Sequence, residues 1–204
     1  MSHSAPIILA MTGASGACYG LRLLETLLKD GRQVYFLISK AAQAVFAMET
    51  DLDIPSRPQE AQAYLTEYYK AKPDQIIVYG REQWSSPVAS GSHKAEHMIV
   101  CPCTTGTLSA IAQGASNNLM QRAADVMIKE QRKLMLVVRE MPFSAIHIEN
   151  MLKLAQLGVT IMPANPGFYQ KPQGITDLVD FVVARILDHI GVEHSLLPRW
   201  GLEP

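Results

Sequence analysis

The chain has 204 residues, of which 48% are hydrophobic, and its 18 basic and 19 acidic residues leave a net charge of −1. This balance argues against nucleic acid or an anionic membrane as a partner, and no apolar run approaches the ~20 residues of a membrane-spanning helix. Three cysteines, an odd number, indicate a reducing compartment. We therefore expect a soluble cytoplasmic protein with one domain over residues 1–204.

A short apolar run from Ile7 to Met11 predicts a buried strand, because it is rich in branched side chains and is followed by turn residues. The small residues 12–16 end it, and leucines at helical spacing begin after Ala17. A strand, a small-residue turn and a helix together predict an anion site, since small side chains let backbone N–H groups approach the ligand. The structural alternative is that glycine serves tight geometry alone.

The nature of the anion depends on the residues after the first two strands. Gly13, Gly16 and Gly20 do not form the dinucleotide fingerprint, and the P-loop pattern is absent. The second predicted strand, Val34–Ile38, ends in serine and lysine, where an NAD-binding protein usually presents an acidic residue. A mononucleotide is therefore preferred over NAD.

Apolar strands and helical patterns alternate along the rest of the chain. Strands are predicted at 75–79, 98–101, 134–138 and 159–162, with Pro102 ending the second of these. Helices are predicted at 41–49, 61–69, 107–113, 119–130, 144–157 and 175–190. Residues 84–92 read as a polar loop, mobile or facing a ligand. The pattern predicts a doubly wound, Rossmann-like or flavodoxin-like α/β fold: a parallel sheet between helices.

Ligands of such sheets bind beyond the carboxyl ends of the strands. The residues at five predicted strand ends are 12–15, 39, 103–107, 139–140 and 163–165, and four of these sets are hydroxyl-rich, glycine-bearing or cationic. The hydroxyls of Thr104, Thr105 and Thr107 can cap a helix, bind a phosphate or ribityl chain, or do both. Cys101 and Cys103 lack redox or metal spacing, so we expect them to be packed in the core.

Several charged residues lie where they could serve structure or chemistry. Arg122 and Lys129 share a helix face with Asp125 between them, which by itself predicts a solvated, ion-paired face. Arg139 and Glu140 close a buried strand, where charges are costly unless they are used, so a functional role is favoured.

Other residues give weaker signals. Arg185 stands in an apolar stretch and can simply extend its charge to solvent, and Tyr169 is either packing or a phenolic donor. The six histidines do not cluster, which predicts no metal site. The absence of a Gly-x-Ser-x-Gly elbow argues against a serine hydrolase.

Taken together, these segments resemble the UbiX family of flavin prenyltransferases, formerly described as aromatic-acid decarboxylases. The resemblance runs over nearly the whole chain. It is carried by MTGASGACYG (11–20), LISKAA (37–42), CPCTTGTLSAIAQG (101–114), NNLMQRAADVMIKE (117–130), LVVREMPFSAIHIENMLKL (136–154), PANPGFY (163–169), DLVDFVVARILD (177–188) and LPRWG (197–201).

The resemblance implies a transfer of the dimethylallyl group from dimethylallyl phosphate to N5 and C6 of reduced FMN, without a metal. The FMN contacts it implies are Gly13, Ala14, Ser15, Ser39, Thr104, Thr105, Gly106, Thr107 and Arg139. The phosphate contacts it implies are Arg122, Lys129, Arg139, Tyr169 and Arg185, supplied partly by a neighbouring subunit.

The same resemblance suggests catalytic groups and partners. Glu140 is the candidate acid for the departing phosphate, and Glu49 with Ser15 is the candidate pair that removes the proton from C6. Trp84 or Trp200 could provide aromatic surroundings for an allylic cation. We expect a homo-oligomer, by resemblance a dodecamer, with the tail of about 191–204 packed on a neighbour and a UbiD-type decarboxylase as recipient of the product.

Two alternatives share the expected fold and FMN. One is an FMN-dependent decarboxylase of cysteine-type substrates, which relies on an active-site histidine that this chain does not place at a strand end. The other is a non-catalytic FMN carrier, which would not need Arg122, Lys129, Glu140 and Arg185.

Overall fold

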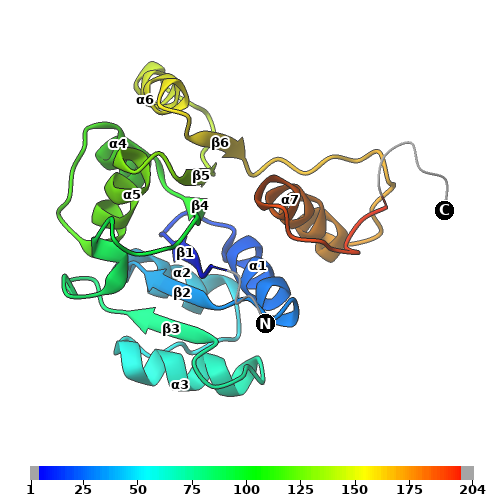
Figure 1. The fold of residues 1–204 in the computed structure, drawn as a ribbon. Coiled ribbons are helices and arrows are strands. Elements are labelled where there is room, and N and C mark those ends of the chain that lie inside the picture. The colour runs from blue at the N-terminus through cyan, green and yellow to red at the C-terminus, as the bar shows by residue number, and fades with distance from the viewer. Residues whose placement is uncertain (1–4, 199–204) are drawn as a thin grey trace.

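Six parallel strands form one sheet in the structure, a computed structural model that describes residues 5–198 (Figure 1). The strands are β1 (Ile7–Met11), β2 (Val34–Ile38), β3 (Ile76–Tyr79), β4 (His97–Cys103), β5 (Lys133–Val138) and β6 (Thr160–Pro163). Their order is β3-β2-β1-β4-β5-β6, and Leu9 at the middle of β1 pairs with Phe36 on one side and Ile99 on the other. The chain thus winds outward from β1 in one direction and from β4 in the other, which creates a switch point between these two strands.

Helices cover both faces of the sheet. One hydrophobic cluster joins the sheet to α1 (Ala17–Lys29), α2 (Lys40–Glu49), α3 (Pro58–Tyr68) and α7 (Ile175–Ile190). A second cluster on the other face includes α4 (Thr105–Ala112), α5 (Leu119–Lys129) and α6 (Ala145–Gln156). The placement of α5 and α7 on opposite faces of the sheet matters for the site below (Figure 1).

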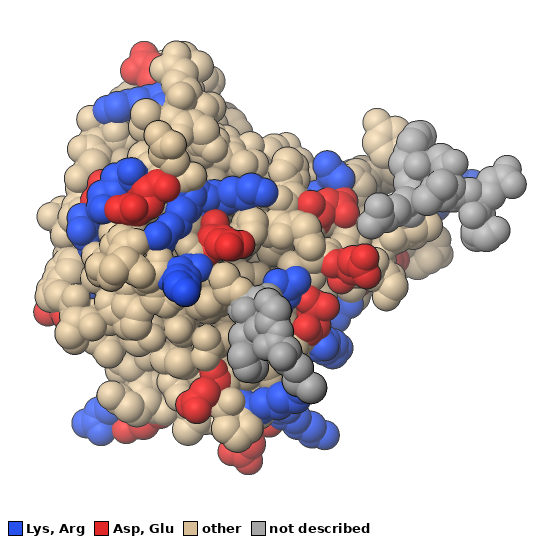
Figure 2. Space-filling view, in the orientation of Figure 1, with Lys and Arg blue, Asp and Glu red and all other residues tan. Residues whose placement is uncertain are grey.

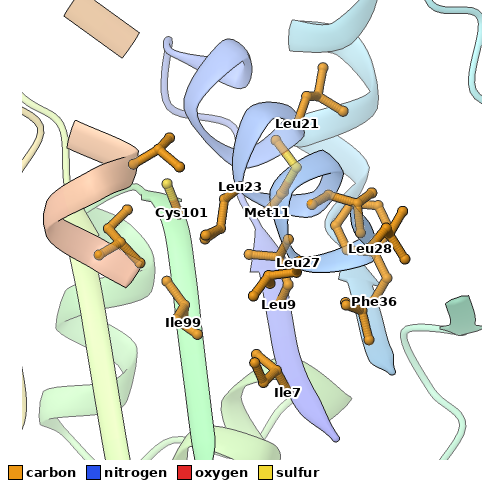
Figure 3. Close-up of a cluster of buried hydrophobic side chains, with 14 of the residues drawn as sticks. Ile7, Leu9, Met11, Leu21, Leu23, Leu27, Leu28, Phe36, Ile99 and Cys101 are labelled. Atoms are coloured by element: carbon orange, nitrogen blue, oxygen red, sulfur yellow. The ribbon is translucent and has the colours of Figure 1, made fainter. Parts of the chain in front are cut away.

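Helix α1 packs directly against the sheet. Leu23 and Leu27 point from this helix toward Leu9, Met11 and the side chains of β4, and all are fully buried (Figure 3). A Cβ on Gly20 would lie 2.3 Å from the carbonyl oxygen of Cys101 and 2.5 Å from Cε of Met11. Gly20 therefore allows this contact, and any larger residue would push the helix away from the sheet.

The predicted fold class is confirmed, and α7 has the predicted bounds. The prediction that Pro102 ends the fourth strand is wrong: β4 continues to Cys103, with a cis Cys101–Pro102 bond and a register shift between Val100 and Cys103. The strand can contain the proline because the ladder is already irregular there. Cys101 and Cys103 are buried as expected, and burial raises the pKa of the Cys103 thiol to about 12.

The loop of residues 84–92 is held by hydrogen bonds, which argues against the mobile alternative, and whether it faces a ligand stays a prediction. It contains a 3₁₀ turn, η1 (Pro87–Ala89), whose Val88 is buried. Arg122 donates from Nε to the carbonyl of Ala89 at 3.1 Å, and Arg132 donates to the carbonyl of Gly91 at 2.6 Å. These charge-assisted bonds fix the loop against α5.

None of the helices within residues 5–198 combines the length and the apolar character that crossing a bilayer demands. Acidic and basic side chains lie next to one another on the face drawn in Figure 2, as the interspersed sequence charges predict.

Candidate active site

A cavity of about 570 Å³ opens at the carboxyl ends of β1, β2 and β4, beside the switch point of the sheet. This is where ligands of doubly wound folds bind, and the volume suits a mononucleotide. Four predicted cofactor residues line it: Gly13, Ser39, Thr104 and Thr107. The remaining lining residues are Thr12, Leu37, Ile38, Lys40, Ala41, Ala44, Tyr79, Arg81, Asn118, Leu119, Met120 and Gln121.

The hydroxyls at this cavity also organise the helix starts around it. Ser39 accepts a hydrogen bond from the Ala42 N–H at 3.1 Å and so caps α2, and Thr104 accepts one from the Thr107 N–H at 3.1 Å and so caps α4. Thr12 donates to the carbonyl of Pro102 at 2.7 Å and accepts from the Thr104 N–H at 2.8 Å, which ties β1 to β4. The capping interpretation is thus confirmed, and ligand binding by the same hydroxyls stays a prediction.

Two glycines show where the turns are crowded and where they are open. A Cβ on Gly13 would lie 2.4 Å from Cβ of Ala41, so the first turn and α2 need a glycine to lie this close. A Cβ on Gly106 would meet nothing within 4 Å. Gly106, with Thr105 beside it in the first turn of α4, therefore borders open space.

The N-terminus of α1 already holds an anion from the same chain. The Glu49 carboxylate, at the end of α2, accepts hydrogen bonds from the Gly16 N–H at 2.8 Å and the Ala17 N–H at 2.9 Å. Burial favours a raised pKa for this carboxyl, but bonds from the Ser15 side chain and from these two N–H groups, with the charge of Arg139, lower it below its ordinary 4.5. The sequence predicted a ligand anion at this helix start, whereas the structure places a carboxylate there.

Arg139 joins the same cluster from the end of β5. Its Nε donates to the carbonyl of Ser15 at 3.1 Å, and its charge acts on Glu49. Ser15, Glu49 and Arg139 therefore meet at the first turn, next to the buried Ala14. Glu140 follows Arg139 and accepts a bond from the Met141 N–H at 3.0 Å, so its carboxylate lies at the same sheet edge.

The two predicted phosphate ligands of α5 lie apart from this cluster. Arg122 pairs with Asp125 at 2.7 Å, as the ion-paired interpretation predicted, and Lys129 pairs with Glu130. The start of α5 lines the cavity, but Lys129 is ten residues further along, about 15 Å at the rise of an α-helix. Lys129 therefore does not face the cavity of its own chain.

Of the remaining predicted residues, Arg185, Tyr169 and Trp84 do not line the cavity. Arg185 is about half exposed on α7 and pairs with Asp188 at 2.8 Å, and Tyr169 is 78% exposed in the segment after β6. Trp84 is exposed at 48%. Trp200 lies outside the residues that the structure describes, and residues 191–198 lie against α7 of their own chain, so packing of the tail on a neighbour stays a prediction.

Sequence reasoning missed several residues of the cavity. Tyr79 is the last residue of the edge strand β3 and Arg81 follows it. The end of β3 is the one strand end left out of the prediction, so the same rule applied there would have found both residues. Asn118 caps α5 through a bond from the Gln121 N–H at 3.0 Å, and the start of a helix was the available signal. Within residues 5–198, no group of three His, Cys, Asp or Glu side chains could hold a metal ion.

Comparison with known proteins identifies the family. The family model described as Flavoprotein matches residues 1–187. The flavin prenyltransferase UbiX of Pseudomonas aeruginosa is 61% identical over 201 residues, which cover 98% of this chain and 96% of that protein. The chain belongs to the UbiX family of flavin prenyltransferases.

Two solved UbiX-type structures have the same fold. One is a UbiX in complex with FMN and dimethylallyl pyrophosphate, with a TM-score of 0.86, 38% identity and coverage of 98% of this chain and 99% of that one. The other is a dodecameric FMN-dependent UbiX-like decarboxylase from Escherichia coli O157:H7, with a TM-score of 0.84, 38% identity and coverage of 96% and 98%.

Proposed function

We propose that this UbiX-family chain joins the dimethylallyl group of dimethylallyl phosphate to N5 and C6 of reduced FMN. The observation that carries the proposal is the hydroxyl-lined cavity at the switch point with the cluster of Ser15, Glu49 and Arg139 beside it. The cavity offers space and hydrogen-bond donors for a flavin mononucleotide, and the adjoining cluster offers groups that bind charge and accept protons.

The residues fit FMN as the acceptor. Ser39, Thr104 and Thr107 are hydroxyl-bearing residues that line the cavity, and a Cβ on the nearby Gly106 would meet no protein atom within 4 Å. We assign the flavin contacts to these residues together with Gly13, Ala14, Ser15, Thr105 and Arg139. Bound and reduced, FMN supplies the nucleophilic ring atoms, while the protein orients the ring and excludes water.

The donor phosphate needs cations to stabilise the negative charge that leaves with it. We assign this role to Arg122, Lys129, Arg139 and Arg185, with Tyr169 as a hydroxyl donor. Arg122 and Lys129 lie on α5 and Arg185 on α7, which cover opposite faces of the sheet. A phosphate site that uses both sets therefore combines residues from neighbouring subunits.

The surface of the chain supports assembly. Ile146, Ile148 and Leu152 of α6 are more than half exposed, as are Met141 before the helix and Phe168 after β6. Large apolar side chains that a folded chain leaves exposed are typical of subunit interfaces. We propose a homo-oligomer of the dodecameric kind described for the related structure, with the tail of 191–204 at its contacts.

Proton transfers complete the proposed mechanism. Glu140 is the candidate acid that protonates the departing phosphate. Glu49 is the candidate acceptor of the C6 proton through Ser15, since its lowered pKa keeps it ionised at neutral pH. As a base it is weak, so its contribution depends on position rather than on basicity.

We propose that a UbiD-type decarboxylase receives the product. All three cysteines are free thiols, which agrees with a reducing, cytoplasmic setting.

The test is anaerobic incubation of the purified protein with reduced FMN and dimethylallyl phosphate, followed by mass analysis of the released flavin. We expect a flavin heavier by one five-carbon unit, lost in Glu140→Gln and retained in the matched surface variant Glu67→Gln on α3. Unchanged flavin with FMN binding intact would refute prenyl transfer and favour the carrier or the decarboxylase.

A further inference from the structure

Asp188, near the end of α7, connects Arg185 to the segment that follows the helix. One carboxylate oxygen accepts a bond from the Arg185 guanidinium at 2.8 Å, and the other lies 3.2 Å from Nε2 of His194. An ionised carboxylate only accepts hydrogen bonds, so His194 donates through Nε2. The three side chains form a chain of hydrogen bonds that starts at Arg185.

His194 is the fixed end of this series of hydrogen bonds. Its side chain is only 7% exposed, and it lies in residues 191–198, which run back along α7. Val192 is buried and Leu196 packs against the cluster beneath α1 and α7, so this segment is attached to the core on both sides of the histidine. A bond anchored in this way restricts the rotation of the Asp188 carboxylate.

The same segment also reaches the loop that carries Tyr169. The Gln170 side chain donates to the carbonyl of Pro198 at 3.1 Å. The segment 191–198 thus contacts Gln170, which follows the proposed phosphate ligand Tyr169. It also contacts Asp188, which pairs with the proposed phosphate ligand Arg185. Both contacts lie outside the flavin cavity.

We propose that Asp188 and His194 are positioning residues for the donor phosphate, acting through Arg185. An exposed arginine loses much rotamer freedom when it binds a phosphate, and a guanidinium held beforehand loses less. Asp188 occupies one N–H group of Arg185 and leaves the other donors for the phosphate. The ion pair itself is exposed and therefore weak, so it orders the arginine without withholding it from a dianion.

This inference rests on the proposed function, and its test separates the two. Binding of dimethylallyl phosphate to the oligomer loaded with oxidised FMN, where no turnover occurs, is measured by calorimetry for wild type, Asp188→Asn and His194→Gln. We expect donor affinity to fall about five- to tenfold in both variants. In steady state the donor KM should rise by a similar factor, with kcat and FMN affinity within twofold of wild type.

A double-mutant cycle shows whether the effect passes through Arg185. In an Arg185→Ala background, Asp188→Asn should cause no further loss, whereas a general structural defect would add its full effect. Glu193→Gln, an exposed acid of the same segment, is the matched control and should bind the donor like wild type. If Asp188→Asn and His194→Gln both bind the donor normally, or if the losses add, the inference is wrong. A wild type that binds no donor would instead refute the proposed function.

Discussion

At the scale of single residues, Glu49 links stability to pH. Its pKa is lowered in the folded chain, so its stabilising effect is complete above its ordinary value of 4.5 and is lost as the pH falls through the lowered value. Because the group is exposed, we expect Glu49→Gln to cost only about 0.5–1 kcal/mol at pH 7. Thermal unfolding at pH 7 and pH 4 should show the difference from wild type narrowing in acid. A difference that stays constant would mean that the charge at the start of α1 contributes nothing.

Two glycines allow opposite predictions from the same substitution. Gly20→Ala places a methyl group against the Cys101 carbonyl and Met11, so we expect a loss of about 1–3 kcal/mol in the free energy of unfolding. Gly106→Ala meets open space within a helix and should leave stability unchanged or raise it by up to about 1 kcal/mol. Fluorescence titration should show that Gly106→Ala binds FMN more weakly than wild type, although this variant is as stable as wild type. Normal FMN affinity in Gly106→Ala would remove this residue from the flavin site.

At the scale of elements, α1 and α7 are joined by a bidentate ion pair between Arg22 and Asp180, with distances of 2.6 and 2.9 Å. Both side chains are largely buried, and the pKa of Arg22 is raised above its usual range by its bond to Asp180. Asp180→Asn leaves the guanidinium without its charge partner, and we expect a loss of about 1–3 kcal/mol. Glu25→Gln, which removes a more exposed partner of the same arginine, should cost less than about 0.5 kcal/mol. Urea unfolding measures both, and equal losses would contradict the role assigned to this helix contact.

The elements that local pattern determines were predictable, and the contacts between distant segments were not. The apolar spacing of α7 gave its bounds, because the helix buries one face and ends at Gly191 with a φ of +70°. Nothing near Glu49 in the sequence indicates that it caps a helix 32 residues earlier. Adjacent parallel strands bring the start of α2, not its end, to the start of α1. The contact therefore depends on the direction in which α2 runs from the sheet edge, which no local pattern specifies.

The candidate site was predictable to the same extent. Strand ends identified Gly13, Ser39, Thr104, Thr107 and Arg139, since parallel strands bring their carboxyl ends to one edge. The position of each cation relative to the sheet could not be read from the sequence. It depends on which face each helix covers, and that follows from the direction in which the chain winds.

At the scale of the whole molecule, placement of the cations predicts a site shared between chains. If α5 of one subunit and α7 of another hold the same phosphate, an Arg122→Ala chain and an Arg185→Ala chain should complement each other in mixed oligomers. Each variant alone should lose most prenyl transfer, because a cation is missing from every site. Co-expression with two affinity tags isolates the mixed oligomers, whose activity is measured by flavin mass analysis.

The expected recovery follows from random assembly. In an equal mixture, half of the sites receive an intact α5 and half of those an intact α7, so about a quarter of wild-type activity should return. Arg122→Ala mixed with Lys129→Ala is the matched control, since both residues lie on α5 and every shared site then lacks one of them. Recovery in the first mixture and none in the control would locate α5 and α7 of the active site on different subunits. No recovery in either mixture would mean that one chain supplies both helices to its own site, against the opposite faces that they cover.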